Sequence, residues 1–452
     1  MDSSTIKNSF DQKLDPLKES LKKKPLPSLN FSAHQISSHL LKLTIDVHPQ
    51  VTECLYDQTI ELFKGKNLDG FDKAEIPSAY VEESFKNEIN KKIKNYLFKH
   101  LIIDHLMTEI LARKILMANY PRLNKITFNP DHSISFVFDI SIADPIPFKE
   151  WKHFSFKSPK RKKYKDLDKQ VVQFMDKETI SERKQNHSLI EEGDWVCFQT
   201  TLFNKKNEQV SKNLVSTFWI KIKTHEVCDP LGTLFLGKNI NDSFITNHLE
   251  IDDSINDYEN YRYDFLVKIN SIIKGTNLSL DCFKSAFKLK NKTEIHNKLM
   301  EVFSYRNDQS QRKSIIEEIF HLFLTKHRFE IPKHLILRRQ EDILLSLTQQ
   351  PDYQVYKAQK DFGDHIEQLA EKQLKEEILV DQIAYNENIK IELKDMQHYL
   401  HLFNSKRLRE FVYFKPLIEK IDIVNTPINT GLLAQTVMRE KTLNHIIHVL
   451  TH

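Results

Sequence analysis

Residues 265–272, Phe265-Leu266-Val267-Lys268-Ile269-Asn270-Ser271-Ile272, end the last part of the chain in which apolar residues recur at every second position. Such alternation predicts strands with one buried face, and residues 196–202 show it as well. From about residue 278 the period becomes helical, as in one apolar stripe at Ile315, Ile316, Ile319, Phe320 and Phe323. The switch predicts a β-rich domain over residues 158–274 and a large all-α domain over 275–452.

The chain before residue 158 mixes both periods. Alternation over residues 41–47 and again over 134–142 predicts two strands, and Val81, Phe85, Ile89, Ile93 and Leu97 recur every four residues as in a long amphipathic helix. Residues 1–33 are polar and rich in lysine, which is typical of an extension outside a core. We therefore expect an α+β multidomain protein with a small α+β domain over 34–115 and a connector with one strand over 116–157.

Composition and motifs exclude several functions. Only 8 glycines occur in 452 residues, few for a Rossmann or TIM-barrel enzyme. The segment Gly232 to Asn239 imitates a phosphate-binding loop, but Asn239 replaces the magnesium-binding hydroxyl and the interior is apolar. The pairs His398/His401 and His445/His448 lack a third ligand for a metal. We expect no cofactor, no bound metal and no use of ATP.

Charge and hydropathy predict the partners of the protein and the compartment in which it lies. A net charge of +4 is too small to indicate nucleic-acid binding, and we interpret the basic run over residues 157–165 as a solvated linker rather than an RNA contact. The N-terminal residues contain no apolar segment typical of a secretory signal, and no run approaches 18 apolar residues. We expect a cytoplasmic protein without DNA or membrane partners.

Three motifs in order carry a family resemblance. The first is Gly70-Phe71-Asp72-Lys73-Ala74-Glu75-Ile76-Pro77, the second is Ile331-Pro332-Lys333-His334-Leu335-Ile336, and the third runs from Ala370 to Ile389. Together they resemble trigger factor, the bacterial ribosome-associated chaperone, over most of residues 35–452. The resemblance implies that Gly70, Phe71, Asp72, Lys73 and Pro77 form a ribosome-docking loop. Asp72 and Glu75 stand where the family has cations, which would weaken contact with a polyanion.

The β-rich domain resembles an FKBP-type prolyl isomerase, on Glu192-Gly193-Asp194 at its start and the residues from Phe265 to Ile272 at its end. Such an enzyme needs an apolar, aromatic-lined pocket that desolvates the X–Pro amide. The resemblance implies that the pocket residues are Phe218, Val227, Cys228, Leu231, Tyr258 and Phe265. The pocket-floor motif is altered, because Pro230 replaces a glycine and Leu231 an aromatic residue, and core packing of a β-domain is the competing interpretation.

Family architecture further implies an elongated molecule in which helical arms form a cradle and the isomerase-like domain lies at the far end. The implied function is an ATP-independent chaperone that holds nascent or unfolded polypeptides at the ribosome exit and assists folding and export. A ribosome-free holdase of the same fold and a working prolyl isomerase are the alternatives.

Overall fold

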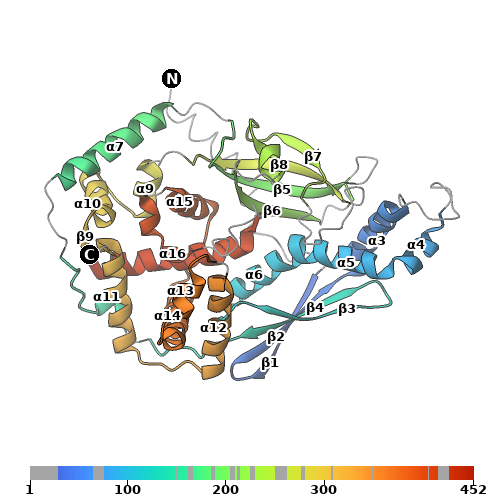
Figure 1. Cartoon of the computed structure of the whole chain (residues 1–452), viewed down its shortest axis with the longest axis horizontal. Coiled ribbons are helices and arrows are strands. Elements are labelled where there is room, and N and C mark those ends of the chain that lie inside the picture. The colour runs from blue at the N-terminus through green and yellow to red at the C-terminus, as the bar shows by residue number, and fades with distance from the viewer. Residues whose placement is uncertain are drawn as a thin grey trace.

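The computed structural model in Figure 1 describes most of the chain. The described residues are 29–64, 76–148, 150–160, 166–184, 189–203, 209–210, 214–223, 230–249, 262–275, 280–306, 309–348, 350–405, 407–415 and 427–451.

The N-terminal part is built on a four-stranded antiparallel sheet in the order β1-β2-β4-β3. Its strands are β1 (Leu29–Ser37), β2 (Leu40–Val47), β3 (Arg122–Phe128) and β4 (Ile134–Ser141). The alternation over 41–47 and 134–142 is thus confirmed as two paired strands. We expected a domain boundary at residue 115, but β3 and β4 of this sheet lie beyond it. We also expected a polar extension up to residue 33, but β1 begins within it.

Helices cover one face of this sheet because the inward residues of β2 and β4, such as Leu43, Ile45, Phe136 and Phe138, need a cover. The covering elements are α3 (Pro49–Lys64), α4 (Ser78–Ser84), α5 (Lys86–Leu97), a π-helical turn (Phe98–Ile102) and α6 (Ile103–Ala112). The last three follow one another without a break and run between the N-terminal sheet and the second sheet towards the centre of the molecule (Figure 1).

A second antiparallel sheet forms the middle of the molecule, in the order β11-β6-β5-β8-β7. Its elements are β5 (Trp195–Phe203), β6 (Val215–Lys221), the helix α8 (Pro230–Phe235), β7 (Ser243–Thr246), β8 (Asp264–Ile273) and β11 (Ile428–Asn429). The alternation around residues 196–202 and 265–269 is confirmed. The strand β11 comes from near the C-terminal end of the chain and pairs with β6 at Trp219 and Phe218.

The middle sheet is covered on both faces. On one face Phe198, Phe218 and Phe265 share a single core with the N-terminal helices. On the other face Trp195 and Trp219 lie in the core of the helical part. The family-derived expectation that the isomerase-like domain lies apart at the far end of the molecule is therefore wrong for this structure.

Helices make up the remainder of the chain. They are α7 (Leu167–Lys184), α9 (Leu280–Ala286), α10 (Lys292–Phe303), α11 (Gln311–Lys326), α12 (Lys333–Thr348), α13 (Tyr353–Lys357), α14 (Phe362–Asn386), α15 (Leu393–Asn404) and α16 (Thr430–Thr451). The short elements among them are the 3-10 turns Trp151–His153 and Leu408–Phe411 and the hairpin of β9 (Tyr305–Arg306) and β10 (Gln309–Ser310). The helix α7 packs on α10, so it belongs to this core although the expected boundary assigned it to the β-rich domain.

The helix α16 lies at the centre of the molecule (Figure 1) and contacts α6, α14 and α15. Gly431 in its first turn permits the close contact with α6, because a Cβ there would lie 3.0 Å from the Met107 Cβ and 3.2 Å from the Asp104 carbonyl oxygen. The Gly431 amide also donates to the Asp104 side chain at 3.0 Å. Among the described residues, no helix is long and apolar enough to cross a bilayer.

Candidate functional site

The expected ribosome-docking loop falls between α3 and α4. Gly70, Phe71, Asp72 and Lys73 lie outside the described residues. Pro77 is exposed and directly precedes α4, where its missing N–H costs nothing to the helix. Ile76 beside it is buried in the N-terminal core, so the loop's C-terminal end is anchored.

Three of the six candidate isomerase residues are described, and all three are buried on one face of the middle sheet. Phe218 on β6 is 6% exposed, Leu231 on α8 is 3% exposed and Phe265 on β8 is fully buried. They belong to one continuous core. Val227, Cys228 and Tyr258 lie outside the described residues.

A ring from the N-terminal helices occupies the space between these aromatic residues. The His100 imidazole stacks on Phe265 with ring centroids 5.2 Å apart and meets Phe218 edge-on at 5.2 Å. Tyr96 stacks on the same imidazole at 4.6 Å and lies 6.1 Å from Phe265. Phe218, Phe265 and Tyr96 therefore pack around part of the His100 ring, and we call these three aromatic rings the aromatic cage.

Local structure and burial hold His100 in this place. It sits in the π-helical turn, whose extra residue shifts the helix face that meets the sheet, and the Ser216 hydroxyl donates to its carbonyl oxygen. Burial lowers the pKa of His100 to about 3, so the ring is neutral at physiological pH. A neutral imidazole packs on aromatic faces without the cost of a buried charge.

A second candidate surface lies on the helices α12, α13 and α14. Large apolar side chains there face solvent rather than a core. These residues are Leu337 (48% exposed), Leu345 (67%), Val355 (68%), Tyr356 (44%) and Leu369 (40%). We call them the arm face, since α12 and α14 correspond to the arm motifs of the sequence. The five residues stand on three helices that follow one another in the chain, and exposed apolar surface of this kind is used by proteins that bind other polypeptides.

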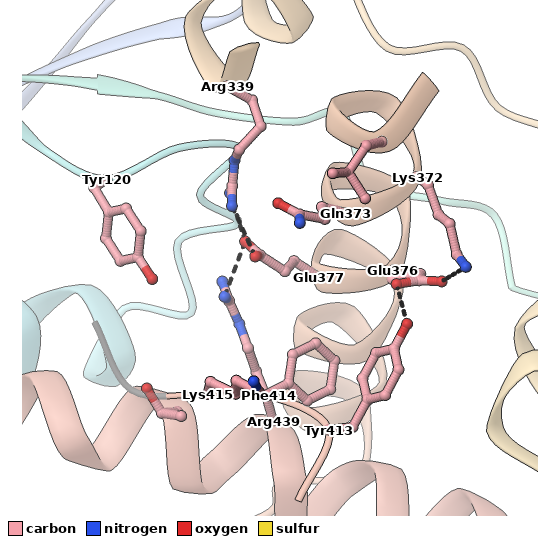
Figure 2. Close-up of a pocket in the computed structure, with 12 residues that line it drawn as sticks. Tyr120, Arg339, Lys372, Gln373, Glu376, Glu377, Tyr413, Phe414, Lys415 and Arg439 are labelled. Atoms are coloured by element: carbon pink, nitrogen blue, oxygen red, sulfur yellow. Dashed lines mark hydrogen bonds and ion pairs between the residues drawn. The ribbon is translucent and has the colours of Figure 1, made fainter. Parts of the chain in front are cut away.

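The helices α12 and α14 also carry charged residues that are buried or half-buried. Arg339 on α12 donates two hydrogen bonds to Glu377 on α14, at 2.9 and 2.6 Å. Arg439 on α16 donates to Asp381 at 2.8 and 2.7 Å and lies 2.9 Å from Glu377. Figure 2 shows both guanidinium groups converging on Glu377. These bonds link three helices, and each carboxylate is paired, as burial requires.

A pocket of about 290 Å³ opens beside this cluster and is lined by Tyr120, Lys372, Glu376 and Tyr413 among others (Figure 2). The Tyr413 hydroxyl donates to Glu376 at 2.7 Å, while the second carboxylate oxygen of Glu376 has no hydrogen-bond partner and lies 3.9 Å from the Lys372 ammonium. Burial raises the pKa of Glu376 to about 7. The carboxyl group is therefore partly protonated at neutral pH.

The two histidine pairs of the sequence lie on α15 and α16. Burial lowers the pKa of His398 and His445, and it lowers the pKa of His401 to about 4. Within the described ranges, no group of three or more His, Cys, Asp or Glu residues is placed to hold a metal ion.

The sequence alone identified neither His100 as a core residue of the middle sheet nor the buried charges on α12, α14 and α16. His100 stands next to an apolar helix stripe and carries no local motif that marks it. The signal for the buried charges was weak but present, since Glu376, Glu377 and Asp381 interrupt the apolar spacing of a helix that contains Leu374, Ile378 and Leu379.

Two models of one protein family match the chain. The model described as "Bacterial trigger factor protein (TF)" matches residues 29–174, and the one described as "Bacterial trigger factor protein (TF) C-terminus" matches residues 291–407. A curated relative, trigger factor of Rickettsia canadensis (strain McKiel), is 20% identical over 418 residues, which cover 88% of each chain. A solved structure titled "Promiscuous Substrate Recognition in Folding and Assembly Activities of the Trigger Factor Chaperone" is 14% identical and covers 93% of this chain and 99% of its own, with a TM-score of 0.35.

The two matched segments coincide with the N-terminal sheet and its helices and with the helical part, on either side of the middle sheet. They define a multidomain α+β chaperone. The chain belongs to the trigger factor family, and its function is that of a chaperone in protein folding.

Proposed function

We propose that this chaperone holds newly synthesised or unfolded polypeptides in an open state through the arm face, in the cytoplasm and without ATP. The observation that carries the proposal is the exposure of five large apolar side chains on α12, α13 and α14. Residues of these types normally lie in a core, and here the core side of the same helices is formed by other residues.

The energetics of such a surface suit reversible holding. Each apolar side chain of a client that the arm face covers contributes about 1.5–3 kcal/mol of binding free energy. A few such contacts give weak binding, from which a folding client can dissociate. A client that buries its own apolar residues loses the apolar contacts that hold it on the arm face. The cycle therefore needs no nucleotide.

Suppression of aggregation tests this proposal. We expect a triple variant, Leu337→Ser, Leu345→Ser and Val355→Ser, to lose most of the ability to slow aggregation of a denatured client at equimolar ratio. The matched control places serine at Ile36, Leu123 and Ile240, which are 56%, 39% and 44% exposed on other parts of the molecule. Equal loss in both variants, or no loss in the first, would contradict the assignment to the arm face.

We further propose that the chaperone works at the ribosome exit through the loop between α3 and α4. Family membership and the retained Gly70, Phe71, Lys73 and Pro77 support this. Co-sedimentation with ribosomes tests it: Phe71→Ala with Lys73→Ala should reduce pelleting, and Asp72→Arg with Glu75→Lys should increase it because repulsive anions become cations. If neither pair changes pelleting, the ribosome-free holdase is the better description.

Prolyl isomerisation, the alternative function, is disfavoured by one observation: the His100 ring packs against both Phe218 and Phe265, two of the candidate pocket residues. A proline ring would need access to the same aromatic faces, which His100 occupies in this structure. We expect the intact chain to show background turnover in a protease-coupled proline-peptide assay. High turnover in the intact chain would show that the cage opens readily or that the active pocket lies elsewhere.

A further inference from the structure

A groove of about 1050 Å³ runs along the helical part, apart from the arm face. It lies between α10, α15, the C-terminal half of α16 and the segments that follow α9 and α14. Six lysines line it: Lys288, Lys290, Lys298, Lys390, Lys394 and Lys441. Four carboxylates line it as well: Glu294, Glu301, Glu387 and Asp395. We call it the lysine groove.

The carboxylates of the lysine groove are already engaged. Glu301 pairs with Lys298 at 2.9 Å and Asp395 with Lys441 at 2.8 Å. Glu387 pairs with Lys152, which lies outside the groove lining, at 2.7 Å. Glu294 accepts the Lys290 backbone N–H at 2.8 Å as part of the cap of α10. Lys394 pairs with Glu392, which lies outside the groove lining, at 2.8 Å. Among the described residues, Glu294 is the one groove carboxylate without an ion pair, and six lysines against four carboxylates leave the lining with an excess of positive charge.

Three lysines stay unmatched. Lys288, Lys290 and Lys390 are exposed, and within the described part of the chain none of them has a carboxylate at ion-pair distance. The histidines His398 and His445, which also line the groove, are neutral at physiological pH because burial lowers their pKa. The groove therefore presents a positive field that an anionic partner would balance.

The lining favours a polypeptide over RNA. All six cations are lysines, whereas single-stranded RNA is commonly held by arginine and by aromatic rings on which bases stack. The described lining contains no tyrosine or tryptophan, and its phenylalanine, Phe287, is 8% exposed with the Lys298 ammonium 5.1 Å above its ring, so no base can stack on it. Apolar side chains of Leu289, Ile389 and Ile447 also contribute to the lining.

We propose that the lysine groove binds acidic segments of unfolded polypeptides. Glutamate and aspartate side chains would pair with Lys288, Lys290 and Lys390, and neighbouring apolar residues would lie on Leu289 and Ile389. The proposal goes beyond the holding function of the arm face, because it adds a charge preference that an apolar surface cannot supply.

Fluorescence anisotropy with the full-length chain tests the proposal. The probe is a short fluorescein-labelled peptide of alternating glutamate and leucine. The comparison probes are the same peptide with lysine in place of glutamate, and a single-stranded RNA of equal charge. The variant is Lys288→Glu, Lys290→Glu and Lys390→Glu. The matched control reverses three exposed lysines on other elements, Lys86, Lys125 and Lys268.

We expect the acidic peptide to bind the unaltered chain, and its dissociation constant to rise about tenfold or more in the groove variant and little in the control. Three results would overturn the proposal: no binding of the acidic peptide, equal weakening in both variants, or RNA binding that is as tight and is lost with the same three lysines. Aggregation suppression with an apolar, uncharged client should survive in the groove variant, which keeps this test separate from that of the arm face.

Discussion

The helix pair α12 and α14 differs between its two sides. The inner side is mainly apolar core, as at the fully buried Leu374. Within that core Arg339 and Asp381 are buried and, with the half-buried Glu377, are paired across three helices. On the outer side of α12, Leu337 and Leu345 face water. The inner side thus holds paired charges among apolar residues, and the outer side of α12 exposes apolar residues.

The contrast separates residues that hold the fold together from residues that are free to bind a client as proposed above. Buried ion pairs add little net stability compared with apolar packing, but their geometry fixes how α12, α14 and α16 meet. Apolar residues in water add nothing to the fold and remain available for binding. Substitutions on one side at a time test whether the two sides have these separate roles.

The largest effect is expected on the inner side. Arg439→Ala leaves Asp381 and part of the Glu377 charge buried without a partner, so we expect a loss of about 3–5 kcal/mol in the free energy of unfolding. Urea denaturation followed by circular dichroism measures it. The double variant Arg439→Met with Asp381→Leu should recover part of the loss, because it removes the unpaired charge as well. A loss below about 1 kcal/mol for Arg439→Ala would mean that water reaches the cluster.

An intermediate effect is expected at Glu376, with a defined pH dependence. Below about pH 4.5 this group is protonated in both the unfolded and folded states. As pH rises towards about 7, only the unfolded state ionises freely, so stability is lost across this window, by about 3 kcal/mol at most. Glu376→Gln should therefore match the unaltered chain at pH 5 and exceed its stability by about 1–2 kcal/mol at pH 8.

Urea denaturation at the two pH values measures this difference. Glu371→Gln is the matched control, since its side chain is 40% exposed on the same helix and pairs with Lys375. A pH-independent difference between Glu376→Gln and the unaltered chain would contradict the buried, partly protonated carboxyl.

The smallest effect on stability is expected on the outer side. Leu345→Ser should change the free energy of unfolding by no more than about 0.5 kcal/mol, since its side chain is 67% exposed. The matched variant Leu374→Ser replaces a fully buried leucine of α14 and should cost at least about 2 kcal/mol. Similar losses in the two variants, seen by thermal or urea melting, would show that the arm face is packed in solution.

Much of the fold could be predicted from the sequence because its strands and helices keep clean periods. Leu41 to Val47 alternates and forms β2, and the stripe from Ile315 to Phe323 forms α11. The packing between the parts could not be predicted in the same way. Trp195, Cys197 and Trp219 are buried on the second face of the middle sheet, where alternation alone predicts solvent.

The candidate sites, like the fold, depend on contacts that sequence periodicity does not give. Helix spacing predicts the exposed arm face only once the buried side of each helix is known. The resemblance to an FKBP-type isomerase implied Phe218 and Phe265 as pocket residues, and both lie in one core, but the ring that contacts them comes from residue 100, which no local pattern links to that sheet. The lysine groove depends on which carboxylates are already paired, and pairing is a property of three-dimensional contacts.

The position of the two-residue strand β11 in the sequence affects the order in which the protein folds during translation. Ile428 and Asn429 complete the edge of a sheet whose other strands lie far earlier in the chain, and they do so beside Trp219 and Phe218. During translation this edge stays open until residues 428 and 429, far downstream of β8, have left the ribosome. The central sheet of this chaperone therefore stays incomplete while most of the helical part is being made.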